Sequence, residues 1–177
     1  MTILVNNAGI LYTGYFNDVI ADQVREGTIV NTFPYVLLTR ALLPNLKQKS
    51  KSLIVNLASS ASFQAIPSLQ VYAATKVFDR FFSEALRSEL KNTGIEVLTV
   101  CPMYVQTSMV NNTEASWRSG VTTCSQYVDY LIDCMSSKKP KGLIYGPPHH
   151  TATAVISQSL LGMISNTRLA YKFIDMY

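Results

Sequence analysis

The sequence predicts an α/β fold in which a doubly wound parallel sheet carries helices on both faces. This prediction rests on two observations. The first is a set of short, continuous apolar runs, which are typical of strands buried on both faces. The second is that these runs alternate with longer segments whose apolar residues recur at helical spacing. This alternation is the pattern of βαβ units, whose crossover helices cover a parallel sheet. Ligands of such sheets bind at the carboxyl ends of the strands, so the loops that follow the strands are the informative ones.

The individual elements follow from the apolar spacing. Four runs are predicted to be strands: Ile3–Val5, Leu53–Leu57, Ile95–Val100 and Leu143–Tyr145. Three segments are predicted to be helices: Thr28–Leu46, Tyr72–Leu90 and Cys124–Met135. The second helix shows the broadest apolar stripe, which we expect protein to cover; it includes Phe78, Phe81, Phe82 and Leu86. Pro34 leaves two alternatives for the first helix, which either bends there or starts close by.

Length and composition bound the class of protein. A chain of 177 residues is enough for one domain with a real core, and 48% apolar with 15% charged residues is ordinary for a soluble globular protein. The formal net charge of +4 is modest and its basic residues are scattered, so we expect no nucleic-acid partner. Three cysteines without CxxC spacing argue against a disulfide framework or a zinc site and are interpreted as reduced thiols.

The chain is divided into a main unit, residues 1–146, and a C-terminal extension, residues 147–177. Two placements stay open for the apolar segment Thr151–Ile164, which is either a buried helix or an element that lies on a membrane surface or in a groove. The His149–His150 pair is interpreted as part of a solvated loop after Pro147–Pro148, and no metal is expected.

Tyr72 and Lys76 are the first candidates for chemistry. Residues four apart share one face of a helix, so the ammonium of Lys76 would favour the phenolate and lower the pKa of Tyr72. A phenol tuned in this way can exchange a proton with a carbonyl or an alcohol. A plain surface pair is the alternative for these two residues. Ser59 directly follows a predicted strand and could donate to an oxygen held near the phenol; loop solvation or helix capping is its alternative, and Ser60 and Ser62 are local rivals.

The order of these residues resembles a known family. Asn6-Asn7-Ala8-Gly9, Asn31, Ser59 and Tyr72-x-x-x-Lys76 are similar to the ordered motifs of short-chain dehydrogenases/reductases. The segment Pro102–Thr107 resembles the loop of that family that touches the nicotinamide, with Pro102-Met103 in place of the usual Pro-Gly. The resemblance runs from Met1 to about Gly146. It implies a Rossmann-like fold and NADP as cofactor, with NAD as the alternative.

The resemblance also implies roles for individual residues. Tyr72 would be the general acid or base, Lys76 would lower its pKa and hold the cofactor ribose, and Ser59 would polarise the substrate oxygen. Asn31 would hold a water that links Lys76 to solvent. The cofactor-binding residues implied are Asn7, Ala8, Gly9, Tyr72, Lys76, Val105 and Thr107, and Asn7 with its neighbours would steady the sheet next to the cofactor.

One part of the family pattern is missing from this sequence. The first residues match the fourth strand of the family, so we expect only a partial sheet with an exposed edge, lacking the first three strands and the Gly-rich turn that receives the pyrophosphate. Two functions therefore stay open. One is an oxidoreductase, and the other is a truncated, non-catalytic fragment that acts only by association with a full-length relative.

Within the family, Phe33-Pro34-Tyr35 and Cys101–Met109 are similar to the branch of 17β-hydroxysteroid dehydrogenases and very-long-chain 3-oxoacyl-CoA reductases. This similarity implies an apolar substrate, a steroid or a 3-oxoacyl-CoA, and a place on the cytosolic face of the endoplasmic reticulum membrane, or else in the cytoplasm. It also implies a homodimer that pairs through the helices near Asn31 and Tyr72.

Overall fold

The computed structural model describes residues 2–111, 121–137, 142–152 and 154–156. Four parallel strands form the main sheet in the order β1-β2-β3-β6. Their bounds are β1 (Thr2–Asn6), β2 (Ser52–Leu57), β3 (Ile95–Val100) and β6 (Leu143–Ile144). These are the four predicted strands, and β1 forms the expected edge of the sheet among the described residues. A second, two-stranded sheet was not predicted; it pairs β4 (Val105–Gln106) with β5 (Thr122–Thr123).

The helices match the prediction in place but not always in length. Their bounds are α1 (Ala21–Lys47), the 3-10 turn η1 (Ser60–Phe63), α2 (Gln70–Glu89), α3 (Ser108–Asn111) and α4 (Cys124–Ser136). Helix α1 begins well before the predicted Thr28 and continues through Pro34, so the alternative of a start near Pro34 is wrong. Its first turns are mostly polar and solvent-facing, and they therefore lack the apolar periodicity from which the helix was predicted.

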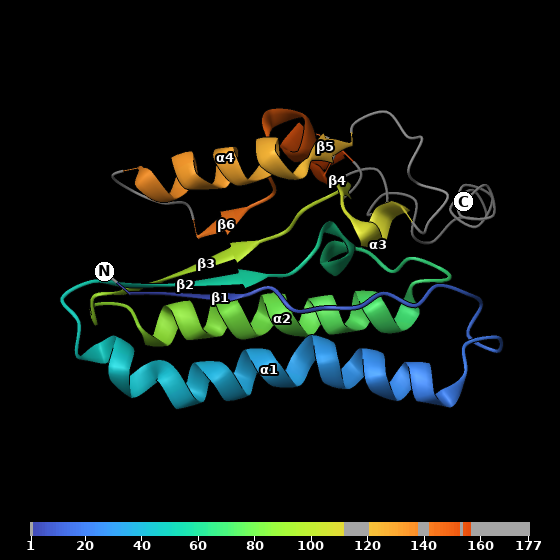
Figure 1. Cartoon of the computed structure of the whole chain (residues 1–177), viewed down its shortest axis with the longest axis horizontal. Coiled ribbons are helices and arrows are strands. Elements are labelled where there is room, and N and C mark those ends of the chain that lie inside the picture. The colour runs from blue at the N-terminus through green and yellow to red at the C-terminus, as the bar shows by residue number, and fades with distance from the viewer. Residues whose placement is uncertain (1, 112–120, 138–141, 153, 157–177) are drawn as a thin grey trace.

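The sheet separates two apolar layers. Figure 1 shows α1 and α2 side by side on one face and α4 on the other, as a doubly wound fold requires. Side chains alternate along each strand, so successive residues enter different layers. The layer under α1 and α2 contains Leu46, Ile54, Leu86, Leu90, Ile95 and Val97. The layer under α4 contains Leu53, Val55, Leu98, Val100, Tyr127 and Ile144.

Helix α2 buries a different stripe from the one its apolar residues suggested. The buried side chains are mostly polar and include Thr75, Lys76, Asp79 and Ser83, with Leu86 and Leu90 completing the stripe at its C-terminal end. Phe78 and Phe81, which were expected to be covered, are exposed in this chain, while Phe82 is half-buried and Leu86 is buried. The expectation of a covered stripe therefore holds only for Phe82 and Leu86 within one chain, because the inner face of α2 is occupied by polar contacts.

A buried hydrogen-bond network ties these polar side chains to the sheet. The Asn6 amide donates to Thr39 at 3.1 Å and to Asn56 at 2.7 Å, and the Asn56 amide donates to Ser83 at 2.8 Å. The network therefore joins β1, β2, α1 and α2. Leaving a buried amide or hydroxyl without a partner costs free energy, so these pairings favour one position of the two helices on the sheet.

The C-terminal extension is described only in part. Residues 148–152 and 154–156 are helical, and the rest of the predicted segment Thr151–Ile164 lies outside the described residues. The interpretation of a solvated loop at His149–His150 is wrong for the backbone, which is helical, and for His150, which is 1% exposed, whereas His149 is exposed as expected. Both imidazole Nε2 atoms lie 2.9 Å from the hydroxyl of Thr122. Burial against Tyr127 holds this helix on the β5–α4 corner.

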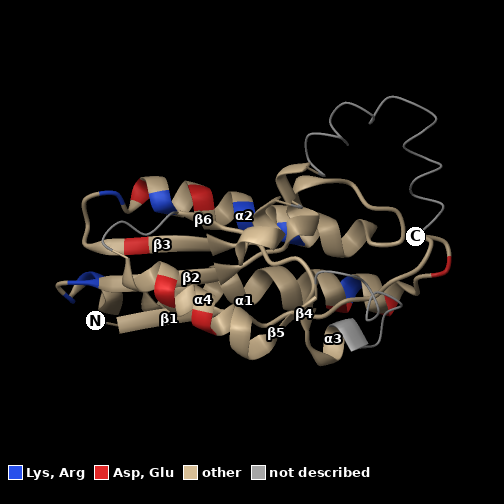
Figure 2. Ribbon diagram, turned by 90° about the horizontal axis from the view of Figure 1, so that it is seen from above, with Lys and Arg blue, Asp and Glu red and all other residues tan. Residues whose placement is uncertain are grey.

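Charged residues are dispersed over the described parts of the molecule. Figure 2 shows Lys and Arg interleaved with Asp and Glu along the helices and turns. Within residues 2–111, 121–137, 142–152 and 154–156, no cluster of three or more potential metal ligands occurs. Across the same ranges, no helix has both the length and the hydropathy that crossing a membrane requires.

We predict that Asn56→Ala destabilises the fold by about 2 kcal/mol, because the buried side chains of Asn6 and Ser83 each lose a hydrogen bond to Asn56. Urea unfolding followed by circular dichroism measures the change. Asn45→Ala, at an exposed position of α1, is the matched control and should change stability by no more than about 0.5 kcal/mol. Equal effects of the two substitutions would contradict a role for the network.

Candidate active site

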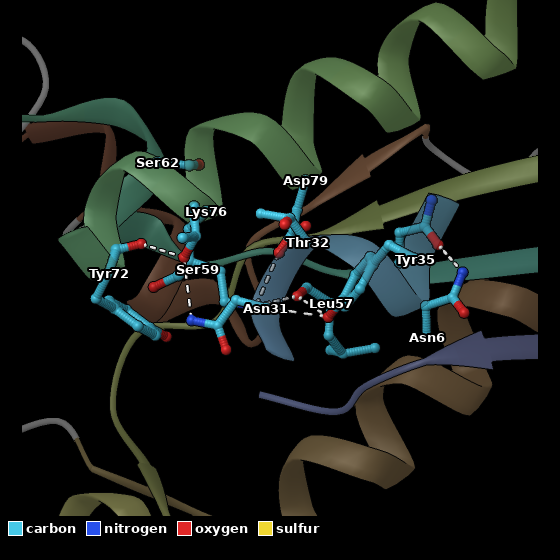
Figure 3. Close-up of polar contacts among 12 residues, drawn as sticks. Asn6, Asn31, Thr32, Tyr35, Leu57, Ser59, Ser62, Tyr72, Lys76 and Asp79 are labelled. Carbon is cyan, nitrogen blue, oxygen red and sulfur yellow. Dashed lines mark hydrogen bonds and ion pairs between the residues drawn. The ribbon is translucent and has the colours of Figure 1, made fainter. Parts of the chain in front are cut away.

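The loops after β1, β2 and β3 meet at the carboxyl edge of the sheet. The backbone N–H of Ser60, after β2, donates to the carbonyl of Pro102, after β3, at 2.8 Å. After β1, a Cβ placed on Gly9 would lie 3.4 Å from Asn31 Oδ1 and 3.6 Å from Lys76 Nζ. The chain thus approaches both side chains closely at this glycine, and the predicted site residues lie around one point (Figure 3).

Ser59 and Tyr72 interact directly. The Ser59 hydroxyl faces the phenol of Tyr72 and lowers the pKa of that phenol, as the prediction of their placement expects. Ser59 also accepts a hydrogen bond from the backbone N–H of Ala61 at 3.1 Å and so caps η1, which was its alternative role. The rival Ser62 is buried elsewhere, with its hydroxyl 3.9 Å from the sulfur of Cys101. Of the three serines, Ser59 is the one whose hydroxyl reaches Tyr72.

Lys76 lies on the same face of α2 as Tyr72 but is buried beneath it. Its ammonium is 5.9 Å from the centre of the Tyr72 ring. It donates to the carbonyl of Leu57 at 2.9 Å, to the carboxylate of Asp79 at 2.9 Å and to the hydroxyl of Tyr35 at 3.5 Å. The alternative of a surface pair is therefore wrong, since Lys76 is buried and three oxygens surround its ammonium.

The environment of Tyr72 differs from the expectation in one respect. Burial raises the pKa of Tyr72, the facing hydroxyl of Ser59 lowers it, and the negative charge of Asp79 raises it further. Lys76 was expected to lower this pKa, but its charge is directed mainly to Asp79. The net shift is therefore upward, and in this arrangement Tyr72 is a proton donor rather than a phenolate.

Asn31 connects the segment after β1 to both helices. Its side-chain oxygen accepts from the N–H of Ile10 at 2.8 Å, while its amide donates to the carbonyl of Ile10 and the hydroxyl of Thr75, each at 3.0 Å. A cavity of about 10 Å³, which matches roughly one water molecule, lies beside Asn31 and Tyr72. Gly27 also lines this cavity.

The predicted cofactor contacts divide into two groups. Gly9 approaches Lys76, and Val105 lies in β4 with Thr107 just after it, both half-buried at the same edge of the sheet. Asn7 and Ala8 are exposed. The side chain that steadies the sheet is Asn6, not Asn7, because alternation along β1 turns Asn6 inward.

Two further residues of the site were missed in the sequence. Asp79 pairs with Lys76, and Tyr35 donates its hydroxyl proton to the carbonyl of Leu57 at 2.6 Å. The signal for Asp79 was its spacing, since a residue three after Lys76 shares its helix face. No comparable signal identified Tyr35, because its contact with the carbonyl of Leu57 depends on how α1 packs against β2.

Comparisons with known proteins agree with this arrangement. Residues 1–117 match the family described as short chain dehydrogenase. The very-long-chain 3-oxoacyl-CoA reductase of Bos taurus is 31% identical over 162 residues, covering 89% of this chain and 50% of that protein. Dehydrogenase/reductase SDR family member 7B of Rattus norvegicus is 39% identical over 110 residues, covering 62% of this chain and 34% of that protein. The chain thus spans half or less of the length of these two relatives.

Solved structures show the same fold. A short-chain dehydrogenase from Burkholderia cenocepacia in complex with NADP superposes with a TM-score of 0.78 at 23% identity, covering 94% of this chain and 70% of that one. A short-chain dehydrogenase from Sphingobium yanoikuyae in complex with NADPH gives 0.75 at 26% identity, covering 94% and 65%. With its parallel sheet and the Ser59–Tyr72–Lys76 group at the carboxyl edge of that sheet, the chain belongs to the short-chain dehydrogenase family.

Proposed function

We propose that this chain carries the catalytic centre of an NADP(H)-dependent oxidoreductase that interconverts a carbonyl and an alcohol. The observation that carries the proposal is the convergence of three side chains at the carboxyl edge of the sheet. Ser59 faces the phenol of Tyr72, and the ammonium of Lys76 lies beneath that phenol, 5.9 Å from the centre of its ring. A raised pKa keeps Tyr72 protonated at neutral pH, so it can donate a proton to a developing alkoxide. Ser59 adds a second donor to the same oxygen.

The residues present fit the nicotinamide and ribose end of the cofactor. The absence of a side chain at Gly9 brings the segment after β1 close to Lys76. The longest of the three Lys76 contacts, the one to Tyr35 at 3.5 Å, is the one that a ribose hydroxyl would replace. Asn7, Ala8, Val105 and Thr107 would line the same edge. When bound, the nicotinamide supplies or accepts the hydride. Asn31 would hold a water in the adjacent cavity and so connect the site to solvent.

For the substrate we propose a 3-oxoacyl-CoA, and for the location the endoplasmic reticulum membrane. The support is the similarity to very-long-chain 3-oxoacyl-CoA reductases, at 31% identity in the bovine protein. NADP is proposed over NAD because the neighbours solved with NADP and NADPH give TM-scores of 0.78 and 0.75. Two neighbours solved with NADH, a 4-hydroxyisoleucine dehydrogenase and a 3-ketoacyl-(acyl-carrier-protein) reductase, each give 0.71. A ketosteroid is the competing substrate, and the assay below includes it.

We predict that Tyr72→Phe lowers kcat by about 10²–10⁴-fold, because the substitution keeps the ring and deletes only the proton donor. The assay is NADPH oxidation with a 3-oxoacyl-CoA or a 17-ketosteroid, in the natural polypeptide that contains residues 1–177. Tyr15→Phe, at an exposed tyrosine, is the matched control and should retain activity. Full activity of Tyr72→Phe would contradict the mechanism, and turnover of the steroid alone would contradict the proposed substrate.

A second prediction separates Ser59 from its rival. Ser59→Ala should lower kcat by about 10²-fold, as loss of one donor to a developing oxyanion does. Ser62→Ala removes a hydroxyl of the same kind that faces Cys101, and its activity should stay close to that of the parent. Steady-state kinetics of both variants at saturating NADPH tests the difference. Equal losses would mean that the segment is needed for folding rather than for donation.

We also propose that the chain forms a homodimer through the outer faces of α1 and α2. Large apolar side chains are exposed there on both helices: Phe33, Leu37, Phe78 and Phe81, with Leu37 and Phe81 each 59% exposed. A contiguous exposed apolar face of this kind marks an interaction surface. A second copy covers it with the same surface, as two-fold symmetry requires.

Lysine substitution tests the dimer. Leu37→Lys combined with Phe81→Lys should convert the dimer to a monomer in sedimentation velocity, because a dimer would bury the introduced ammonium groups without partners. Ile132→Lys, at an exposed apolar position of α4, should leave the dimer intact. A parent protein that sediments as a strict monomer across micromolar concentrations would contradict the proposal.

A further inference from the structure

The ion pair between Lys76 and Asp79 is the one buried ion pair among the described residues. The ammonium and the carboxylate are 2.9 Å apart, and the side chain of Asp79 is 0% exposed. The other two pairs, Asp22–Arg25 and Arg80–Glu84, include exposed side chains. A buried pair is costly, because both ions lose their hydration and packed apolar residues would often serve stability as well. Its place at the base of the site therefore points to function.

The surroundings make Asp79 depend on Lys76. The second carboxylate oxygen, Oδ1, makes no hydrogen bond within the described part of the chain. Opposite the pair, α1 contributes Tyr35 and β2 contributes the carbonyl of Leu57, while Tyr72 lies one turn before Lys76 on α2. Of these groups only Lys76 is cationic. The ammonium thus lies between a carboxylate and a phenol that compete for its charge.

We propose that Asp79 is a positioning residue, which holds the ammonium of Lys76 against Leu57 and whose ionisation controls how readily Tyr72 gives up its proton. With Asp79 ionised, the positive charge is neutralised and Tyr72 holds its proton firmly. With Asp79 protonated or removed, the charge of Lys76 acts on Tyr72 and favours the phenolate. The proposal rests on the proposed function only in taking Tyr72 as the proton donor.

Electrostatics in the site agrees with this assignment. Burial raises the pKa of Asp79 to about 6, although the charge and hydrogen bond of Lys76 oppose the shift. The negative charge of Asp79 in turn raises the pKa of both Tyr72 and Tyr35. Asp79 therefore changes charge near pH 6, and the acidity of Tyr72 changes with it: Tyr72 is the stronger acid below that pH and the weaker acid above it.

The unaltered protein provides the first test, by NMR of chains labelled at tyrosine Cζ, lysine Cε and aspartate Cγ. As pH rises through about 6, the Asp79, Lys76 and Tyr72 signals should move with one common midpoint. Tyr72→Phe assigns the tyrosine signal. Lys76 and Tyr72 signals that stay flat while Asp79 titrates would overturn the proposal. This test needs no variant of Asp79 and no cofactor or substrate.

Variants provide the second test. Asp79→Asn should lower the alkaline titration midpoint of Tyr72 by at least about one pH unit, which is the shift that loss of a nearby charge typically causes. Asp79→Glu should return the midpoint to that of the parent protein. Asp22→Asn removes an exposed carboxylate with the same three-residue spacing to its cation and should leave Tyr72 unchanged. An unchanged Tyr72 in a folded Asp79→Asn protein would overturn the proposal, and if that variant does not fold, the titration of the parent decides. Because these readouts involve no catalysis, a failure of the proposed reductase assay is distinguishable from a failure here.

Discussion

The carbonyl of Leu57 is the point on which the arrangement of the site depends. It lies at the carboxyl end of β2 and accepts from both the hydroxyl of Tyr35 and the ammonium of Lys76. Those donors come from different helices, so one backbone oxygen sets the position of α1 and α2 relative to the strand. The carbonyl has an orientation fixed by the parallel sheet, and the two helices must adjust to it. Tyr72, one turn before Lys76, is thereby held next to Ser59, which follows β2 after Ala58.

This constraint explains the unusual distribution of polar and apolar side chains around α2. A helix on a sheet normally turns its apolar stripe inward, but here the inward stripe carries Thr75, Lys76, Asp79 and Ser83. Polar side chains at the site need partners on the sheet and on α1, and Asn56 and Asn31 provide them. Phe78 and Phe81 consequently lie on the outer side, where the proposed second copy of the chain would cover them. The same helix therefore carries both the chemistry and the proposed interface.

A buried cation without a carboxylate would be unstable, yet a carboxylate beside Lys76 also weakens its effect on Tyr72. In this site Asp79 both stabilises the buried ammonium of Lys76 and weakens its effect on Tyr72. Burial and the charge of Asp79 raise the pKa of Tyr72, whereas Ser59 lowers it. The phenol is thus kept as an acid, which suits donation to an alkoxide better than abstraction from an alcohol at neutral pH. In the proposed function this balance suits Tyr72 to the donation of a proton during reduction of the carbonyl.

The amino-acid sequence by itself determined the class of fold, the four strands of the main sheet and the group Asn31, Ser59, Tyr72 and Lys76. These depend on short-range patterns: apolar runs of strand length, residues four apart on a helix, and motifs that directly follow a strand. The early start of α1 was missed because its first turns are mostly polar and exposed. Only the tertiary structure decided which stripe of α2 is buried, that Asn6 rather than Asn7 steadies the sheet, that His150 is buried against Tyr127, and that Asp79 takes the charge of Lys76. Each of these depends on contacts between segments distant in sequence, whose packing no local pattern specifies.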